Sequence, residues 1–140
     1  MLEAINIGET FEYSLKGDKK DPTIFILGIL DSLIKTRLTD LGMVYKYNPE
    51  APKDSFAEAR MNIAEQDLEF VRFGLKGFKN FKDKKGDDIQ FKTTKRTLAN
   101  TEYEVVSDDT IKLIPRFAIT ELAQKIAEEN KLTGPQRKNL

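Results

Sequence analysis

The stretch RFGLKGFKNF, residues 72–81, decides how the middle of this chain folds. Its ten residues include three phenylalanines, two glycines and three basic side chains. Aromatic rings interleaved with lysines are typical of surfaces on which single-stranded nucleic acid stacks. The same composition is typical of a helix end that buries its aromatic side chains and leaves the helix at a glycine. The two interpretations predict opposite places for the phenylalanines, exposed or buried.

The order of the residues favours burial. The nucleic-acid signature nearest to this stretch is the RNA-recognition pattern K/R-G-F/Y-G/A-F-V-x-F/Y, and KGFKNF fits only its first three positions. Lys79 stands where a small residue is required, and Asn80 stands where an aromatic residue is required. Gly77 is expected to form a left-handed helix cap. The expected core anchors around this helix end are Phe73, Phe78 and Phe81.

The residues before this stretch predict a β-hairpin and two helices. Alternating apolar and polar residues, a turn with glycine and proline, and the apolar run TIFILGIL predict a hairpin over residues 10–29. Asp31 or Ser32 is expected to cap a helix that Gly42 closes. The longest predicted element is a helix over residues 55–74. Its expected apolar face comprises Phe56, Ala59 or Arg60, Ile63 or Ala64, Leu68, Val71 and Leu75.

The residues after this stretch predict a second β element and a final helix. Residues 83–88 have the composition of a turn, residues 89–93 alternate like a short strand, and residues 95–105 are weakly patterned. Ser107 is expected to cap a helical turn, and Pro115 is expected to restart the helix at its first position. The expected amphipathic face of this final helix, which fades at Asn130, comprises Phe117, Ile119, Leu122, Ala123 and Ile126.

These elements together predict an α+β fold. It consists of an N-terminal β-hairpin with a helix, a long central helix, a short second β element and a C-terminal amphipathic helix. A length of 140 residues fits one domain. We expect this domain to span residues 1–132, followed by a short C-terminal tail at residues 133–140.

The composition excludes several kinds of chemistry. The chain has no cysteine and no histidine, so thiolate nucleophiles, disulfides, sulfur-ligated metal sites and histidine general bases are absent. Asp83, Asp87 and Asp88 surround a glycine, but their spacing does not follow a calcium-binding loop, and Lys85 occupies a ligand position. We therefore expect no enzymatic activity, no catalytic residue, no metal site and no cofactor.

Positive charge is concentrated in one part of an otherwise balanced chain. The whole sequence has 23 basic and 23 acidic residues, yet residues 72–96 contain nine Lys or Arg and three Asp. Such a segment attracts an acidic partner or phosphate. The apolar residues Ile24, Phe25 and Ile26 could also add an edge strand to a partner, although burial in the chain's own core is favoured for each of them. The candidate partner-binding residues are Arg72, Lys76, Lys79, Lys82, Lys84 and Lys85.

Three blocks of the sequence resemble a known group of proteins. Within the block 69–91, residues 72–91 fit the pattern R-x-G-L-x-G-[WF]-x-N-[FL]-x-D-x-x-G-x-x-[IV]-x-F, and the flanking blocks are DPTIFILGIL at 21–30 and LIPRFAITELAQKIAEENKLTGPQRKNL at 113–140. The pattern is similar to that of small proteins in the structural modules of tailed bacteriophages or prophages, either tail-assembly-chaperone-like or minor virion proteins. The residues that fit it are Arg72, Gly74, Leu75, Gly77, Phe78, Asn80, Phe81, Asp83, Gly86, Ile89 and Phe91.

The resemblance implies a non-enzymatic protein that binds other phage structural or assembly proteins during head or tail formation. The N-terminus lacks the basic and apolar regions of a secretion signal, and the longest apolar run is too short to span a bilayer. We therefore expect the host cytoplasm as its location, with incorporation into the virion and homo-oligomerisation left open. Two alternatives remain: a nucleic-acid-binding protein that uses residues 72–96, and an inhibitor of a host defence protein.

Overall fold

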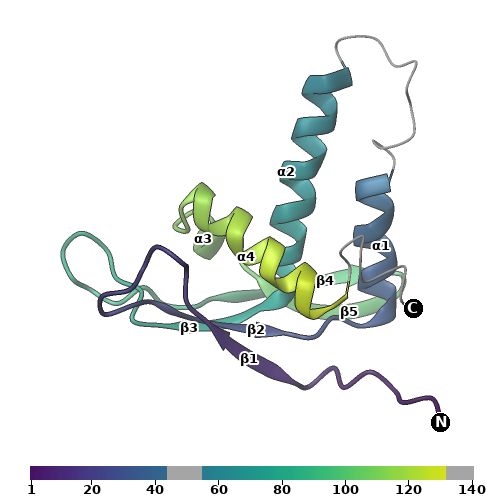
Figure 1. Ribbon diagram of the computed structural model, residues 1–140, viewed down its shortest axis with the longest axis horizontal. Helices are drawn as coiled ribbons and strands as arrows, with labels where there is room; N and C mark the ends of the chain where they lie inside the picture. Colours follow the sequence, from purple (N-terminus) through teal and green to yellow (C-terminus); the bar gives the residue numbers. More distant parts are fainter. Residues whose placement is uncertain (44–54, 132–140) are drawn as a thin grey trace.

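The computed structural model describes residues 1–43 and 55–131. Its helices and antiparallel strands confirm the predicted α+β fold. Helices α1, α2 and α4 lie on one face of the strands, as Figure 1 shows. In chain order, the elements are β1 (Thr10–Tyr13), β2 (Ile24–Gly28), α1 (Ser32–Met43), α2 (Ser55–Gly74), β3 (Leu75–Lys79), β4 (Thr93–Leu98), β5 (Thr101–Val106), α3 (Asp108–Ile111) and α4 (Arg116–Glu129).

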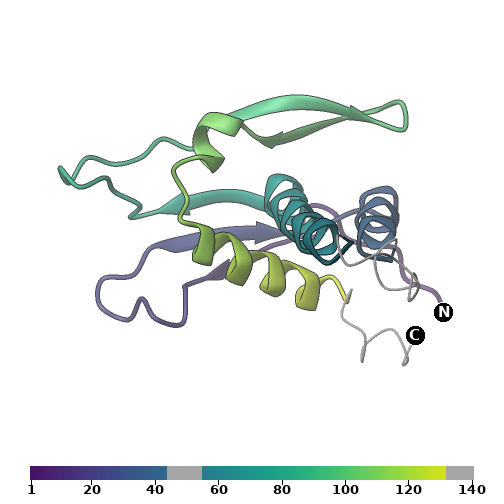
Figure 2. The same ribbon diagram turned by 90° about the horizontal axis from the view of Figure 1, so that it is seen from above.

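The strands form two antiparallel sheets. β1, β2 and β3 make one sheet in that order, and β4 and β5 make a separate hairpin. Seen from above, this hairpin lies beyond β3 and next to α2 (Figure 2). β1 and β4 are therefore at opposite ends of the strand layer.

The N-terminal hairpin is confirmed, and its strand alternation positions the core. Phe11 lies opposite Leu27, and Tyr13 lies opposite Phe25. Phe25 and Leu27 are buried under the helices. Because β2 is the central strand of its sheet, the expectation that Ile24 to Ile26 offer a free edge is wrong.

Residues 72–81 join the end of α2 to strand β3 without a loop. α2 ends at Gly74 and β3 begins at Leu75. Gly77 lies opposite Ile26 within the sheet, so its prediction as a left-handed cap is wrong. Asn80 has the left-handed conformation instead, with φ of 58°, and its side-chain amide donates to the carbonyl oxygen of Asp21 at 2.9 Å.

The phenylalanines of this stretch pack as the buried interpretation predicts. Phe73 is buried and meets the ring of Tyr103 edge-on at 5.7 Å. Phe78 and Phe81 are half-buried, and their ring centres are 5.0 Å apart. Phe78 also contacts the rings of Phe25 and Phe91. The rings pack against one another, which favours the burial interpretation of this stretch.

The second β element differs from its prediction. The strand expected at residues 89–93 is absent from the described structure, and the segment interpreted as weakly patterned contains hairpin β4–β5. Ala99 and Asn100 connect its strands, with φ values of 49° and 63°. Positive φ at both positions is the geometry of a type I′ turn, which suits the twist of a hairpin. Most side chains on this hairpin are polar and exposed, so an apolar alternation was not available to predict it.

The C-terminal helices follow the prediction with one exception. Ser107 caps α3, and Pro115 occupies the N-cap position of α4, one residue before its predicted place. Phe117 is 69% exposed, so its assignment to the buried face is wrong. α1 also continues past the predicted stop at Gly42. The predicted tail at 133–140 lies outside the described residues.

Candidate interaction surface

The six predicted partner-binding residues do not form a single patch. Arg72 is on α2, where its side chain is only 18% exposed. Lys76 and Lys79 belong to β3, on the sheet. The remaining three, which are exposed in the segment between β3 and β4, are Lys82, Lys84 and Lys85.

The segment after β3 is a solvated turn held by one aspartate. Asp83 accepts hydrogen bonds from the backbone N–H groups of Lys85 and Asp87 at 2.9 and 3.0 Å. Gly86 has φ of 87°, a value that favours glycine. This geometry agrees with the predicted turn and leaves the lysines of the segment in solvent.

The two lysines of β3 serve different neighbours. The stem of Lys76 lies across Gly28, where an added Cβ would come within 2.7 Å of Lys76 Cε. Burial lowers the pKa of Lys76, against the opposing charges of Glu104 and Asp31. Lys79 pairs with Glu12 of β1 at 3.3 Å in an exposed ion pair, which contributes little to stability. Lys76 and Lys79 thus belong to β3 and are not part of the turn that carries Lys82, Lys84 and Lys85.

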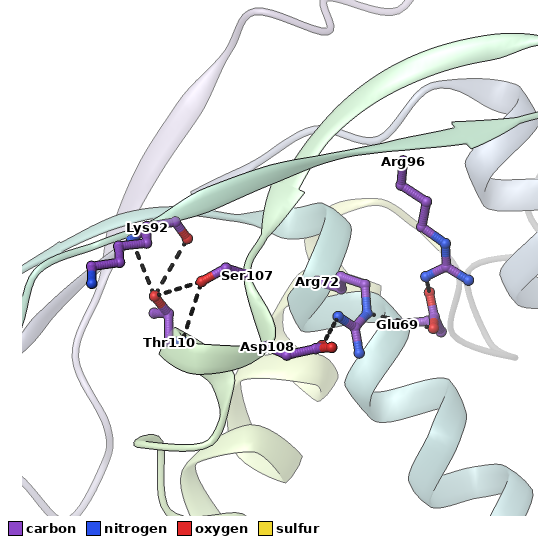
Figure 3. A network of polar contacts seen from close by, with 7 residues as sticks. All are labelled: Glu69, Arg72, Lys92, Arg96, Ser107, Asp108 and Thr110. Carbon is purple, nitrogen blue, oxygen red and sulfur yellow. Dashed lines mark hydrogen bonds and ion pairs between the residues drawn. The ribbon is translucent and has the colours of Figure 1, made fainter.

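Arg72 is the centre of a polar network that ties α2 to the hairpin (Figure 3). Its Nη1 donates to Asp108 at 2.6 Å, and its Nε lies 3.6 Å from Glu69. This hydrogen bond and the charge of Arg72 lower the pKa of Asp108. Arg96, from β4, donates to Glu69 at 2.7 Å and stacks its guanidinium over the ring of Phe73. The predicted binding residue Arg72 is thus occupied in holding the fold.

Thr110 holds the chain in place just before β4, as Figure 3 also shows. It is 1% exposed, and its hydroxyl accepts from the backbone N–H of Lys92 at 3.1 Å. Ser107 donates to the same oxygen at 3.1 Å (Figure 3). The bond to Lys92 anchors the residue before β4 to α3, at the base of the hairpin.

A groove of about 430 Å³ lies between α1, α2 and β4. Its rim is charged and includes Arg37 from α1 and Arg96 from β4. Glu69 and Arg72 separate it from a second hollow of about 360 Å³ beside the hairpin. The apolar residues of the groove are Leu41, Leu68, Phe73 and Leu98. A charged rim around an apolar floor is the usual composition of a protein-binding surface.

Strand β4 presents an open edge next to this groove. In the described structure it pairs with β5 alone. Leu98 and Thr101 flank the two-residue turn and face each other, so they form a hydrogen-bonded pair, and such pairs alternate along the ladder. The N–H groups of Lys95 and Thr97 therefore point outward, away from β5. An edge of this kind can accept a further strand.

Of the residues that line the groove, the sequence predicted only Arg72 as partner-binding. The basic residue Arg96 falls within the predicted basic segment, whereas Arg37, Leu41 and Leu68 come from two helices distant in sequence. Their meeting depends on how α1 packs against α2. The two-residue turn at Ala99 was the one local signal for the hairpin, and it lacks the glycine that usually marks such turns.

Residues 1–43 and 55–131 contain no group of three or more Asp or Glu side chains placed to hold a metal ion. Among the helices within those ranges, none is long and apolar enough to cross a membrane.

No protein-family model, curated protein or solved structure matches the chain.

Replacing Glu69 with alanine is expected to lower the free energy of unfolding by about 1–2 kcal/mol, because two arginines lose their shared carboxylate. Denaturant unfolding measures this effect, and hydrogen exchange should show faster exchange in β4 and β5. Glu65→Ala is the matched control, since Glu65 lines the same groove one helical turn earlier. Equal losses in the two variants would contradict a special role for Glu69.

Proposed function

We propose that this chain is a non-enzymatic protein of a tailed-phage or prophage structural module. It acts in head or tail assembly by binding other assembly proteins. The observation that carries the binding role is the open edge of β4 beside an apolar-floored groove. The phage context is supported by the resemblance of residues 69–91 and their flanks.

The residues that carry this resemblance have structural roles. Gly74 lies against Ile126, Asn80 supplies a left-handed position, and Asp83 and Gly86 form the turn. A shared pattern of this kind supports a shared fold, because each position has a packing or backbone reason. It does not mark the binding surface, which we assign to β4 and the groove.

The lysine-bearing turn after β3 supports a second contact, with an acidic partner. Lys82, Lys84 and Lys85 are exposed in the segment between β3 and β4. Charges at the rim of an interface accelerate association and select partners more than they add affinity. We therefore assign these lysines to steering, and the groove to the stable contact.

Mass spectrometry tests the proposed function directly. The tagged chain is purified from cells in which the source phage or prophage is active, alongside purified particles. Recovery in particles at fixed copy number, or with a head or tail protein from the lysate, is the expected result. Recovery with a host defence protein alone, or with nucleic acid alone, would overturn the proposal.

A charge variant sharpens this experiment. Replacing Lys82, Lys84 and Lys85 with glutamine should slow association with the phage partner and weaken its dependence on salt. The matched control replaces the exposed Lys19 and Lys20 of the β1–β2 connection. Binding to single-stranded DNA or RNA that falls steeply with salt and disappears in the first variant would instead support the nucleic-acid alternative.

A further inference from the structure

The β4–β5 hairpin is held in two different ways along its length. At its base, Val105 and Val106 are 2% and 0% exposed and belong to the core. The N–H of Ser107 also donates to the carbonyl oxygen of Lys92 at 2.9 Å. At the outer end, residues 97–102 are exposed apart from one half-buried leucine. Because no ladder joins the hairpin to β3 in the described structure, side chains alone hold this outer end in place.

Two side chains that lie opposite each other hold the hairpin to the helices. Arg96 pairs with Tyr103 across the ladder. The guanidinium of Arg96 lies 5.6 Å from the ring centre of Phe73, and the ring of Tyr103 meets the same ring edge-on at 5.7 Å. Each side chain also donates a hydrogen bond of 2.7 Å to a carboxylate, that of Glu69 on α2 or that of Asp31 before α1. We call Arg96 and Tyr103 the latch.

The latch can open without leaving either carboxylate unpaired. Glu69 also lies 3.6 Å from the guanidinium of Arg72, and Asp31 also accepts from the backbone N–H of Ile34 at 2.9 Å. Opening would separate the hairpin from Phe73 and would break no ladder bond. A segment that has few buried apolar contacts opens at a low free energy compared with the core. The outer end of the hairpin has this character, whereas its base does not.

Opening of the hairpin would change the groove to which we assign partner binding. Phe73 lines this groove but is only 3% exposed, and both side chains of the latch lie against its ring. Leu98, at the outer end of β4, lines the same groove. With the hairpin moved away, Phe73 would become accessible beside Leu41 and Leu68. The closed hairpin therefore covers part of the apolar floor.

We propose that the β4–β5 hairpin is a hinged flap over the groove, with its hinge at the buried base and the latch of Arg96 and Tyr103 holding it closed. The hairpin opens as an intact unit. A partner that packs against Phe73 binds the open form and increases its population. This part of the inference rests on the proposed function, whereas the opening is a property of the free chain.

Spin-label distances measure the opening. The chain has no cysteine, so Thr36→Cys on α1 and Thr97→Cys on β4 provide two defined labelling sites, both at exposed residues. Double electron–electron resonance then gives the distance between the labels. It is compared between the chain with an intact latch and a chain with the further changes Tyr103→Phe and Glu69→Gln. These changes remove the hydroxyl of the latch and the charge that Arg96 meets, and they keep the shapes of both side chains.

The intact latch should give one main distance. The weakened latch should add a longer distance, with the ratio of open to closed chains raised at least about tenfold, because two hydrogen bonds to carboxylates are lost or weakened. Nuclear Overhauser contacts between Hα protons of β4 and β5 should persist, since the hairpin moves as a unit. The matched control carries Lys95→Gln and Glu102→Gln, which remove the exposed ion pair within the hairpin and should leave the distance unchanged.

Three outcomes would overturn the inference. The first is an unchanged label distance in the chain with the weakened latch. The second is a longer distance together with loss of the Hα contacts, which would mean that the hairpin unfolds. The third is an equal change in the control. None of them contradicts the proposed function, which fails only if the particle and lysate experiments yield no phage assembly partner, so the two failures are distinguishable.

Discussion

Replacing Asn130 with alanine is expected to lower the free energy of unfolding by about 2–4 kcal/mol. Asn130 is 3% exposed at the end of α4. Its side-chain oxygen accepts from the backbone N–H of Leu30 at 2.8 Å, and its amide donates to the carbonyl oxygens of Gly28 and Ile126 at 3.3 and 2.8 Å.

The size of this effect follows from the buried backbone groups that lose their hydrogen-bond partner. The N–H of Leu30 and the carbonyl of Gly28 are buried where β2 gives way to α1, and alanine offers them no partner. An unsatisfied buried polar group costs about 1–3 kcal/mol, in a fold whose total stability is of the order of 5–15 kcal/mol. We expect α4 to detach from the sheet more readily in this variant.

Denaturant unfolding measures the loss, with Asn6→Ala, at an exposed asparagine, as the matched control. The control should change stability by less than about 0.5 kcal/mol. Asn130→Asp keeps the oxygen that accepts from Leu30 but loses both donated bonds, so it should fall below the unaltered chain as well. A loss below about 1 kcal/mol for Asn130→Ala would show that these bonds are replaced by water.

Asn130 also shows where sequence reasoning reaches its limit. The sequence predicted the end of α4 at this residue from a fading apolar pattern. Its bond to Leu30 spans 100 positions and depends on how α4 lies across β2. Local patterns predict where a helix ends, but they contain no information about which distant backbone group its last side chain will meet.

The strands also divide into those that the sequence predicted and those that it did not. The N-terminal hairpin was predictable because Phe11 and Tyr13 alternate with polar residues and face a core. β3 was missed because it follows α2 without a break, and the glycine at its centre suggested a cap. Hairpin β4–β5 was missed because most of its side chains are polar and exposed, so few apolar residues alternate along it. The candidate interaction surface was missed for the same reason, because β4 is its edge strand.

Phe117 is the clearest error in the predicted core. Its spacing from Ile119 and Leu122 is compatible with the apolar face, yet it is 69% exposed while its neighbour Ala118 is 2% exposed. Choosing between adjacent residues requires the rotation of the helix about its axis. α2 sets this rotation by packing against α4, which the sequence of α4 alone does not describe.

Gly74→Val is the second change with a large expected effect, a loss of about 2–3 kcal/mol in the free energy of unfolding. Gly74 is the last residue of α2, and an added Cβ would lie 2.8 Å from Cδ1 and 2.9 Å from Cγ2 of Ile126. Ile126 is fully buried, so it has no free space into which to move. The branched side chain of valine would force α2 and α4 apart or force Ile126 out of its preferred rotamer.

A double-mutant cycle separates this steric cause from a backbone cause. Ile126→Ala alone leaves a cavity and should cost about 2–4 kcal/mol. If the clash is the cause, Gly74→Val should cost at least about 1 kcal/mol less in that background than in the unaltered chain. Gly17→Ala, at a position with no neighbour within 4 Å, should be nearly neutral. Strictly additive losses would contradict a direct contact and assign the requirement for glycine to the turn from α2 into β3.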